Sequence, residues 1–245
     1  VFAQVTNPAI DPIREKLVMT LTSYIGREGS LLEETPEHCR MVQFKNPIFT
    51  NLDIDKLRTW EDEDFKAGTL DITWPLAEGS QGLQRALKKL WHKAEALVDR
   101  DYGFIILSDR KADTENVPIP SLLACASVHH HLVRVKKRTE TALVMETAEA
   151  REVMHFALLF GYGASAINPY GAFATIYDLI TRGHIADIPS YWTAENNYLE
   201  AVHKGLLKIL SKLGISTLRS YHGAQTFEAI GLSAEVIETH FRGTD

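Results

Sequence analysis

Two patterns of hydrophobic residues alternate along this chain from residue 70 onward. Short, nearly continuous apolar runs predict buried strands. These runs are LDITW (70–74), FIILS (104–108), ALVMET (142–147), ASAIN (164–168) and ISTLRSY (215–221). Between them, apolar residues recur every three or four positions, which predicts amphipathic helices over 80–98, 120–135, 150–160, 172–183 and 193–213.

Strands that alternate with helices indicate an α/β fold built from mainly parallel βαβ units. The predicted strands are apolar at consecutive positions, as expected where both faces of a sheet are covered. About five or six such units fit either an incomplete (β/α) barrel of the aldolase (TIM) type or a doubly wound sheet. The barrel interpretation predicts that the strands over 104–108, 142–147 and 164–168 are parallel, with helices outside.

The first part of the chain is irregular, because prolines and glycines interrupt it repeatedly. One helix is predicted from about Pro12 to Tyr24, with Pro12 in its first turn. A length of 245 residues with 45% hydrophobic content is enough for one sizeable core. We therefore expect a single domain over 1–245, with an irregular segment over 1–68 and a regular βαβ part over 69–245.

The stretch GYGASAINPY (161–170) looks at first like a phosphate-binding glycine loop. In a dinucleotide-binding fingerprint, however, the glycines lie after a strand and before a helix. Here Gly161 and Gly163 follow a predicted helix and precede a predicted strand, so we interpret them as a helix end and a tight turn. Asn168 lies at the carboxyl end of that strand, where such folds place their sites.

Polar residues gather at the predicted carboxyl ends of the strands. They are Ser108, Asp109, Arg110, Glu146, Asn168 and His222. In a parallel sheet these positions share one edge, so they would form a pocket at this rim. The alternative is that the carboxylates pair with Arg110 and only hold loops in place, and the lack of an evident nucleophile–base pair favours it.

The other reactive residue types give no metal or thiol site. His129, His130 and His131 lie within one predicted helix, where successive side chains point about 100° apart, so the three cannot face one ion. The two cysteines, Cys39 and Cys125, form no CxxC motif, and Cys125 lies on an apolar predicted helix where it is expected to serve in packing. A cytoplasmic, reducing setting is expected from this low cysteine content. The net charge of −6 and the lack of a long apolar run argue against nucleic-acid and membrane partners.

Six segments together resemble the central domain of the large chain of glutamate synthase. They are VTNPAIDPIRE (5–15), ILSDR (106–110), VHHHL (128–132), METAEAREVMHFALLFGYGASAINPY (145–170), GLLKILSKLGIST (205–217) and SYHGAQTFEAIGL (220–232). They span nearly the whole chain in the order of the family. Small departures are Ala148, where we expect Gly, and Thr226, where the family is usually aliphatic.

This resemblance implies a role in glutamate biosynthesis and ammonia assimilation. In the family, an amino-terminal glutaminase releases ammonia with a cysteine nucleophile. A carboxyl-terminal barrel with FMN and an iron–sulfur cluster then makes glutamate from 2-oxoglutarate, using electrons from a small reductase subunit or ferredoxin. The central domain is barrel-like without a cofactor of its own, links the two catalytic parts and contributes to the ammonia channel.

The residues of this chain agree with a non-catalytic central domain. Val1 stands at the start instead of a nucleophilic cysteine, and two cysteines cannot supply the three thiolates of the family's cluster. We expect the fragment to be inactive and to hold no FMN, cluster or metal. The competing hypothesis is a free-standing TIM-barrel-like enzyme or a flavin-binding domain of the same descent.

The channel segment of the family matches TNPAID here, which implies that Thr6, Asn7 and Ile10 line the ammonia channel. Ammonia must pass unprotonated, so an apolar wall with a few neutral polar groups suits it. Asn7 and Thr6 would hydrogen-bond ammonia, and Ile10 would narrow the passage. The alternative is that Thr-Asn-Pro only caps and turns into the following helix.

Overall fold

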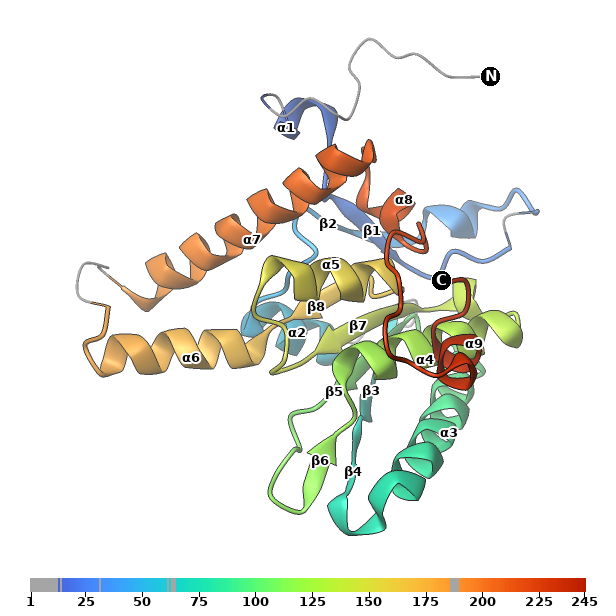
Figure 1. The fold of residues 1–245 in the computed structure, drawn as a ribbon. Coiled ribbons are helices and arrows are strands. Elements are labelled where there is room, and N and C mark those ends of the chain that lie inside the picture. Colours follow the sequence, from blue (N-terminus) through green and yellow to red (C-terminus); the bar gives the residue numbers. More distant parts are fainter. Residues whose placement is uncertain (1–12, 14, 31, 61, 63–64, 186–189) are drawn as a thin grey trace.

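The computed structural model describes residues 13, 15–30, 32–60, 62, 65–185 and 190–245. At its centre lies a four-stranded sheet in which every neighbouring pair is parallel. The strand order is β3 (Ala67–Asp71), β5 (Phe104–Ser108), β7 (Ala142–Glu146) and β8 (Ala166–Asn168) (Figure 1). The three parallel strands predicted from the sequence are thus confirmed.

Strand order and helix placement together identify the winding. The strands follow one another across the sheet in chain order, whereas a doubly wound sheet reverses its order at a switch point. The connecting helices α3 (Gly79–Val98), α4 (Ser121–Arg134) and α5 (Val153–Gly161) all contribute to one core on a single face of the sheet (Figure 1). The sheet is therefore part of a (β/α) barrel wall with helices outside, and the incomplete-barrel prediction is confirmed.

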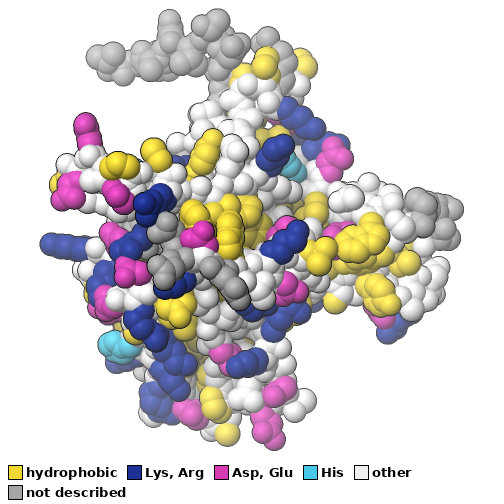
Figure 2. All heavy atoms as spheres, turned by 180° about the vertical axis from the view of Figure 1, so that it is seen from behind, with side chains coloured by type: hydrophobic (Ala, Val, Ile, Leu, Met, Phe, Trp, Pro, Cys, Tyr) yellow, Lys and Arg dark blue, Asp and Glu magenta, His cyan; other side chains and the backbone are white. Residues whose placement is uncertain are grey.

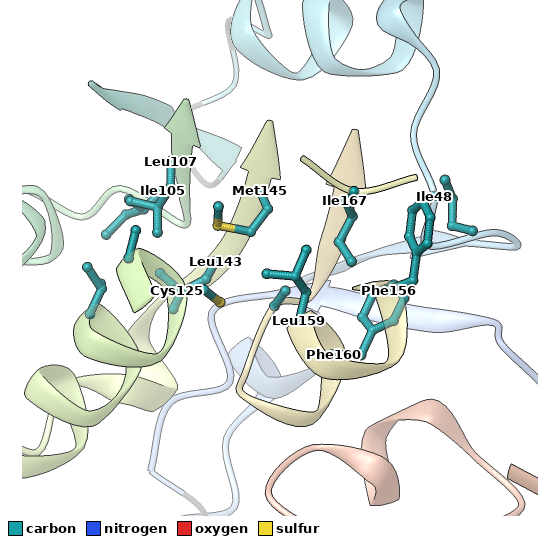
Figure 3. Close-up of a cluster of buried hydrophobic side chains, with 14 of the residues drawn as sticks. Ile48, Ile105, Leu107, Cys125, Leu143, Met145, Phe156, Leu159, Phe160 and Ile167 are labelled. Atoms are coloured by element: carbon teal, nitrogen blue, oxygen red, sulfur yellow. The ribbon is translucent and has the colours of Figure 1, made fainter. Parts of the chain in front are cut away.

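The two faces of the sheet bury alternate residues of each strand, as the two-residue repeat of a strand requires. The helix side is built from Ile105, Leu107, Leu143, Met145 and Ile167 against Cys125, Phe156, Leu159 and Phe160 (Figure 3). The opposite side is built from Phe104, Ile106, Val144 and Ala166 against Ile25, Phe49, Ile54 and Leu57. This second set of partners comes from the irregular first part of the chain, which therefore fills the side that faces the interior of a complete barrel.

The first part of the chain also extends the sheet beyond β8. Ile48 forms a parallel bridge with Ile167. The Phe49 N–H donates to the Ile167 carbonyl at 2.8 Å, and the Ile167 N–H donates to the Pro47 carbonyl at 2.9 Å. A short segment from early in the chain thus occupies the place of the next barrel strand. It is followed by α2 (Asn51–Arg58), which lies across the same side of the sheet.

The remaining elements surround this sheet. β1 (Ser23–Gly26) pairs antiparallel with β2 (Met41–Phe44), and β4 (Thr73–Pro75) pairs antiparallel with β6 (Asn116–Pro118). The helices α6 (Tyr170–Thr181) and α7 (Tyr191–Leu213) form an arm that extends to one side of the molecule (Figure 1). Smaller helices pack on these: α1 (Glu15–Val18) on α7, α8 (Leu218–Tyr221) on α5 and α9 (Ala234–His240) on α4. Short 3₁₀ turns span Pro36–Cys39, Leu76–Glu78 and Arg138–Glu140.

The helix predicted over 12–24 is wrong for most of its length. Among the described residues of this span only Glu15–Val18 is helical, and Ser23–Gly26 is a strand. Met19 and Leu21 are buried whereas Thr20 between them is exposed, which is the alternation of an extended chain. The β-branched residues of this segment favour that conformation.

The strand predicted over 215–221 is also wrong. Thr217 makes a single parallel bridge with Thr20, and the chain then enters the helix α8. The Thr217 side chain accepts a hydrogen bond from the Ser220 backbone N–H, so it caps this helix. The helix-capping hydrogen bond of Thr217 therefore outweighs the β-propensity of the residues in this run. The predicted strand 70–74 is divided at Ile72, where the chain leaves β3 and enters β4.

The glycines of GYGASAINPY take the positions expected of them. α5 ends at Gly161, and Gly163 has a φ of 104°, in the region that favours glycine. The Gly163 N–H donates to the Phe160 carbonyl at 3.1 Å, which closes the turn into β8. The interpretation as a helix end and a tight turn is confirmed.

Candidate functional site

Five of the six residues predicted at the rim lie together at the carboxyl edge of the sheet. Strand register places Ser108 opposite Glu146, and Glu146 opposite Asn168, so the three form a row across β5, β7 and β8. All three are buried, and Asp109 is only 2% exposed. Arg110 reaches the same place from the loop after β5. The five residues thus lie at the edge where the carboxyl ends of the parallel strands meet.

Glu146 is the centre of the cluster. Its Oε1 accepts from Arg110 Nε at 2.5 Å, and its Oε2 accepts from Arg58 Nη2 at 2.8 Å. Burial by itself raises the pKa of Glu146, but the hydrogen bonds from Ser108, Arg110 and Arg58 outweigh it and lower the pKa below its usual value. The carboxylate is therefore held ionised between two guanidinium groups.

Arg110 is fixed on two further sides. Its Nη2 donates to Asn51 Oδ1 at 3.1 Å, and its guanidinium lies 4.2 Å from the centre of the Tyr170 ring. Asn168 donates from Nδ2 to the same Asn51 oxygen at 3.1 Å and to the Phe49 carbonyl at 3.0 Å. These contacts tie the ends of β5 and β8 to the start of α2.

Asp109 is the centre of a second, smaller group of hydrogen bonds at this edge. Its Oδ2 accepts from Thr147 Oγ1 at 2.6 Å, and its carboxylate also accepts from the Ala148 N–H. Burial first, and then a hydrogen bond to Asp109, raises the pKa of Tyr170 well above its usual value. Asp109 thus orients the loop after β7 and the first residue of α6.

Sequence reasoning missed Asn51, Arg58 and Tyr170. The first two lie on α2, inside the segment that was predicted to be irregular. A signal for this helix is present, because Thr50 and Asp53 form a reciprocal capping box at its start. Nothing in the local pattern, however, indicates that α2 faces the carboxyl edge of the sheet.

His222 does not join the rim, which corrects its predicted position. The expected strand before it is the helix α8, so the chain does not run toward the carboxyl edge. His222 instead lines a cavity of about 500 Å³ together with Thr141, which precedes β7, and Ser165, which precedes β8. These neighbours place His222 at the amino edge, on the far end of the strands from Glu146.

Of the three consecutive histidines, His129 and His131 point to different partners, and His130 packs edge-on against the His129 ring. His131 stacks on Trp91 with ring centres 5.3 Å apart and places Nε2 3.2 Å from Glu95 Oε2. His129 Nδ1 accepts from Arg138 Nε at 2.9 Å. Within the described part of the chain, no group of three or more His, Cys, Asp or Glu residues is placed to hold a metal ion. Cys125 is buried in the core, and burial raises its pKa to about 12, so its thiol remains protonated.

Thr6, Asn7 and Ile10 lie outside the described residues. Among the helices that the structure does describe, none is long and apolar enough to cross a membrane.

Comparison with protein families gives a match over residues 1–233 to the model described as "Glutamate synthase central domain". The chain belongs to the glutamate synthase central domain family. It is 44% identical over 245 residues to a glutamate synthase [NADH] of Schizosaccharomyces pombe. It is 43% identical to a glutamate synthase [NADPH] large chain of Bacillus subtilis and 42% identical to a ferredoxin-dependent glutamate synthase 2 of Synechocystis.

These glutamate synthases are much longer than this chain. Each alignment covers 99% of this chain, but only 12% of the S. pombe protein and 16% of each of the other two. The three names specify different electron donors, and their identities to this chain differ by at most two percentage points. Similarity within this family therefore does not assign a donor.

Solved structures with a related shape include a flavocytochrome b2, with a TM-score of 0.44 and 10% identity over 80% of this chain and 45% of that one. A mandelate oxidase has a TM-score of 0.42 and 12% identity over 73% of this chain and 63% of that one. At these values nothing about chemistry follows from the likeness.

Proposed function

We propose that this chain is the non-catalytic central domain of a glutamate synthase, acting in glutamate biosynthesis and ammonia assimilation. It connects the glutaminase part and the FMN- and iron–sulfur-containing synthase part of one large chain. The observation that carries this proposal is the family match over residues 1–233, together with the small share of each relative that the chain spans. The catalytic groups then belong to the rest of the large chain.

The carboxyl edge of the sheet supports a structural role. Barrel enzymes place their reacting groups at this edge. Here both oxygens of Glu146 are engaged by Arg58 and Arg110, and the pKa of Glu146 is lowered. A carboxylate held ionised in this way is a poor proton donor at neutral pH, and both of its oxygens already accept from arginine. The cluster stabilises the ends of three strands.

The arm formed by α6 and α7 supports a linking role. Hydrophobic side chains are visible on this side of the molecule (Figure 2). Tyr177 is 61% exposed and Trp192 is 58% exposed, and both rings contact Tyr191. Exposed aromatic clusters of this kind are typical of surfaces that pack against another part of a protein. We expect the rest of the large chain to cover this arm.

Thr6, Asn7 and Ile10 are proposed as part of the ammonia channel. Replacing Ile10 with Trp in the intact enzyme should obstruct the passage, so that glutamine hydrolysis outruns glutamate formation. Added ammonia should still support synthesis. The matched control is Ile13→Trp, at a side chain that is 91% exposed, and it should leave the coupling unchanged. A one-to-one ratio of glutamine hydrolysed to 2-oxoglutarate consumed in the Ile10 variant would contradict the channel assignment.

The second candidate is a free-standing barrel enzyme or flavin-binding domain. Its test is FMN binding by the 245-residue chain, after near-ultraviolet circular dichroism has shown that the chain is folded. A central domain should keep no flavin through gel filtration and should form no glutamate from glutamine and 2-oxoglutarate. Stoichiometric yellow flavin that follows the protein would favour the second candidate. FMN, the iron–sulfur cluster and the contact with a reductase subunit or ferredoxin are proposed for other parts of the large chain.

A further inference from the structure

The cavity of about 500 Å³ lies at the amino edge of the sheet. Its walls come from β1, from the 3₁₀ turn before β7, from the turn before β8 and from α8. Seven of its lining residues bear on the argument: Thr22, Glu28, His129, Arg138, Thr141, Arg219 and His222. None of them belongs to the rim cluster around Glu146. The cavity is therefore distinct from the rim cluster, and the inference drawn from it does not rest on the proposed function.

Arg138 places a positive charge in this wall without a negative partner. It donates from Nε to His129 Nδ1 at 2.9 Å, from Nη1 to the Thr141 carbonyl at 2.7 Å and from Nη2 to the Gly163 carbonyl at 2.8 Å. All three acceptors are neutral, and no carboxylate of the described residues lies within ion-pair distance of it. Since a guanidinium has five N–H groups, two remain for another acceptor. Burial lowers the pKa of Arg138, and the charge of the Glu28 carboxylate, which lies beyond ion-pair distance, opposes this shift without cancelling it.

The other ionisable groups of the cavity leave this charge unbalanced. Arg219 and Glu28 form an ion pair at 2.6 Å and cancel one another. Burial lowers the pKa of His222 to about 4 and also lowers the pKa of His129, so both rings are neutral near pH 7. The cavity therefore has one net positive charge, which suits a singly charged anion.

Two polar groups of the cavity are buried without a partner. The Thr141 hydroxyl and His222 Nε2 have no hydrogen bond to any described residue. Thr141 is only 2% exposed, and both residues line the same cavity as Arg138. Buried polar groups are nearly always satisfied in folded proteins, so a pair of exceptions beside an open space points to a missing ligand.

We infer that this cavity binds a small oxyanion, a carboxylate or a phosphate. Its oxygen atoms accept from the two remaining N–H groups of Arg138 and from the Thr141 hydroxyl, and His222 Nε2 supplies a further polar contact. The planar guanidinium of the arginine presents paired N–H groups whose geometry matches a carboxylate or a phosphate. The threonine hydroxyl is already buried, so a hydrogen bond to the anion costs it no further contact with water. The neutral hydroxyl-bearing walls, including Thr22, leave room for the body of the ligand.

Hydrogen exchange on the intact natural chain that contains this sequence tests the inference. Sodium acetate and sodium phosphate are titrated separately against sodium chloride of equal ionic strength. Peptides that cover 138–142 and 217–222 should exchange more slowly with one or both probes. Protection by acetate alone identifies a carboxylate ligand, protection by phosphate alone identifies a phosphate ligand, and protection by both shows that the shared charge is recognised. Absence of protection with either probe overturns the inference.

Two variants separate binding from folding. Thr141→Val keeps the side-chain shape and removes only the unpartnered hydroxyl, so it should raise the melting temperature without ligand and weaken binding about tenfold. Arg138→Met should abolish the protection, but this arginine also holds two backbone carbonyls, so its loss weakens the fold as well as the site. Thr141→Val then decides alone. Thr175→Val, on the exposed side of α6, is the matched control and should change neither property. Equal protection in wild type and Thr141→Val overturns the inference.

Discussion

Buried charge is paired with opposite charge at the carboxyl edge of the parallel sheet but has only neutral partners at the amino edge. At the carboxyl edge, Glu146 is fully buried and each of its oxygens accepts from an arginine. At the amino edge, Arg138 donates only to neutral acceptors, and the space beside it is an open cavity. A compensated cluster fixes loops in place, whereas an unpaired charge beside a cavity attracts a ligand.

This difference shows that position in the fold is a poor guide to where this domain binds something. The carboxyl edge is the usual place for sites in β/α folds, and a sequence-based search leads there. In this chain that edge is filled by contacts among its own side chains, from Asn51 and Arg58 to Tyr170. Charge compensation distinguishes the two ends better than topology does, because buried polar atoms without a partner among the described residues occur at both ends: Asn168 Oδ1 at the carboxyl edge, and the Thr141 hydroxyl and His222 Nε2 at the amino edge.

The largest effect is expected from breaking the rim cluster. Glu146→Gln should lower the free energy of unfolding by about 3 kcal/mol, because two arginines then face a neutral amide in a buried site. Urea unfolding at pH 7 measures this loss. The control is Glu78→Gln, whose partner Arg85 is exposed, and it should change stability by about 0.5 kcal/mol or less. Equal losses at the two positions would show that burial adds nothing to the cluster.

A somewhat smaller effect is expected at the amino edge. Gly163→Ala should cost about 2–3 kcal/mol, because φ is 104° and the new methyl group would meet the His129 ring that holds Arg138. Gly183→Ala is a matched control with a φ of 72° and no atom within 4 Å of the added carbon. It should cost about 1 kcal/mol. If thermal or urea unfolding gives the same loss for both variants, the packing of His129 against the turn is unimportant.

Acidification should lower the free energy of unfolding through the two edges in different pH ranges. Burial lowers the folded pKa of His222 to about 4 from its usual 6.5, so the unfolded chain binds the proton first and stability falls as the pH drops from 6.5 toward 4. Glu146 has a lowered pKa, so its contribution persists above the usual carboxyl value of 4.5 and is lost below it. His222→Gln should therefore reduce the loss of stability between pH 7 and pH 5 by about 1–2 kcal/mol.

Urea unfolding of wild type and the His222 variant across this pH range measures the difference. Glu146→Gln serves as the comparison, since it should leave the slope between pH 7 and pH 5 unchanged and flatten the slope only below the usual carboxyl value. Parallel curves for wild type and His222→Gln would show that His222 is not desolvated as the structure indicates.

The smallest effect concerns the helix that brings residues to the rim. Thr50→Ala should cost about 1 kcal/mol, because it removes one half of the capping box with Asp53. Hydrogen exchange should increase over 51–58, the helix that presents Asn51 and Arg58. Thr59→Ala at the other end of α2 removes only hydrogen bonds from an exposed hydroxyl to the Asp55 and Lys56 carbonyls and should cost less. Equal exchange in both variants would mean that packing alone holds α2.

Several features of this molecule follow from local sequence. The runs 104–108 and 142–146 are apolar on both faces and form the two central strands, and Gly163 takes the turn that its position between a helix and a strand predicts. Ser108, Asp109, Glu146 and Asn168 meet at one edge because they follow consecutive parallel strands. The family itself was recognisable from six segments of the chain.

Other features failed to follow from local sequence for identifiable reasons. The helix predicted over 12–24 is wrong because Met19 and Leu21 are buried in an extended segment. The strand predicted over 215–221 is wrong because Thr217 caps a short helix. His222 was assigned to the wrong edge as a result. Short segments of this kind are decided by the neighbours on which they pack.

The amino-acid sequence by itself determined the β/α alternation, the strands of the sheet and the row of polar residues at its carboxyl edge, because burial and strand direction leave a periodic record along the chain. Only the tertiary structure decided that residues 47–49 stand beside β8, that Arg58 neutralises Glu146, and that Arg138 has no acidic partner among the described residues. These properties depend on contacts between segments far apart in sequence. Charge pairing across such distances depends on how the chain closes on itself, and no local pattern encodes it.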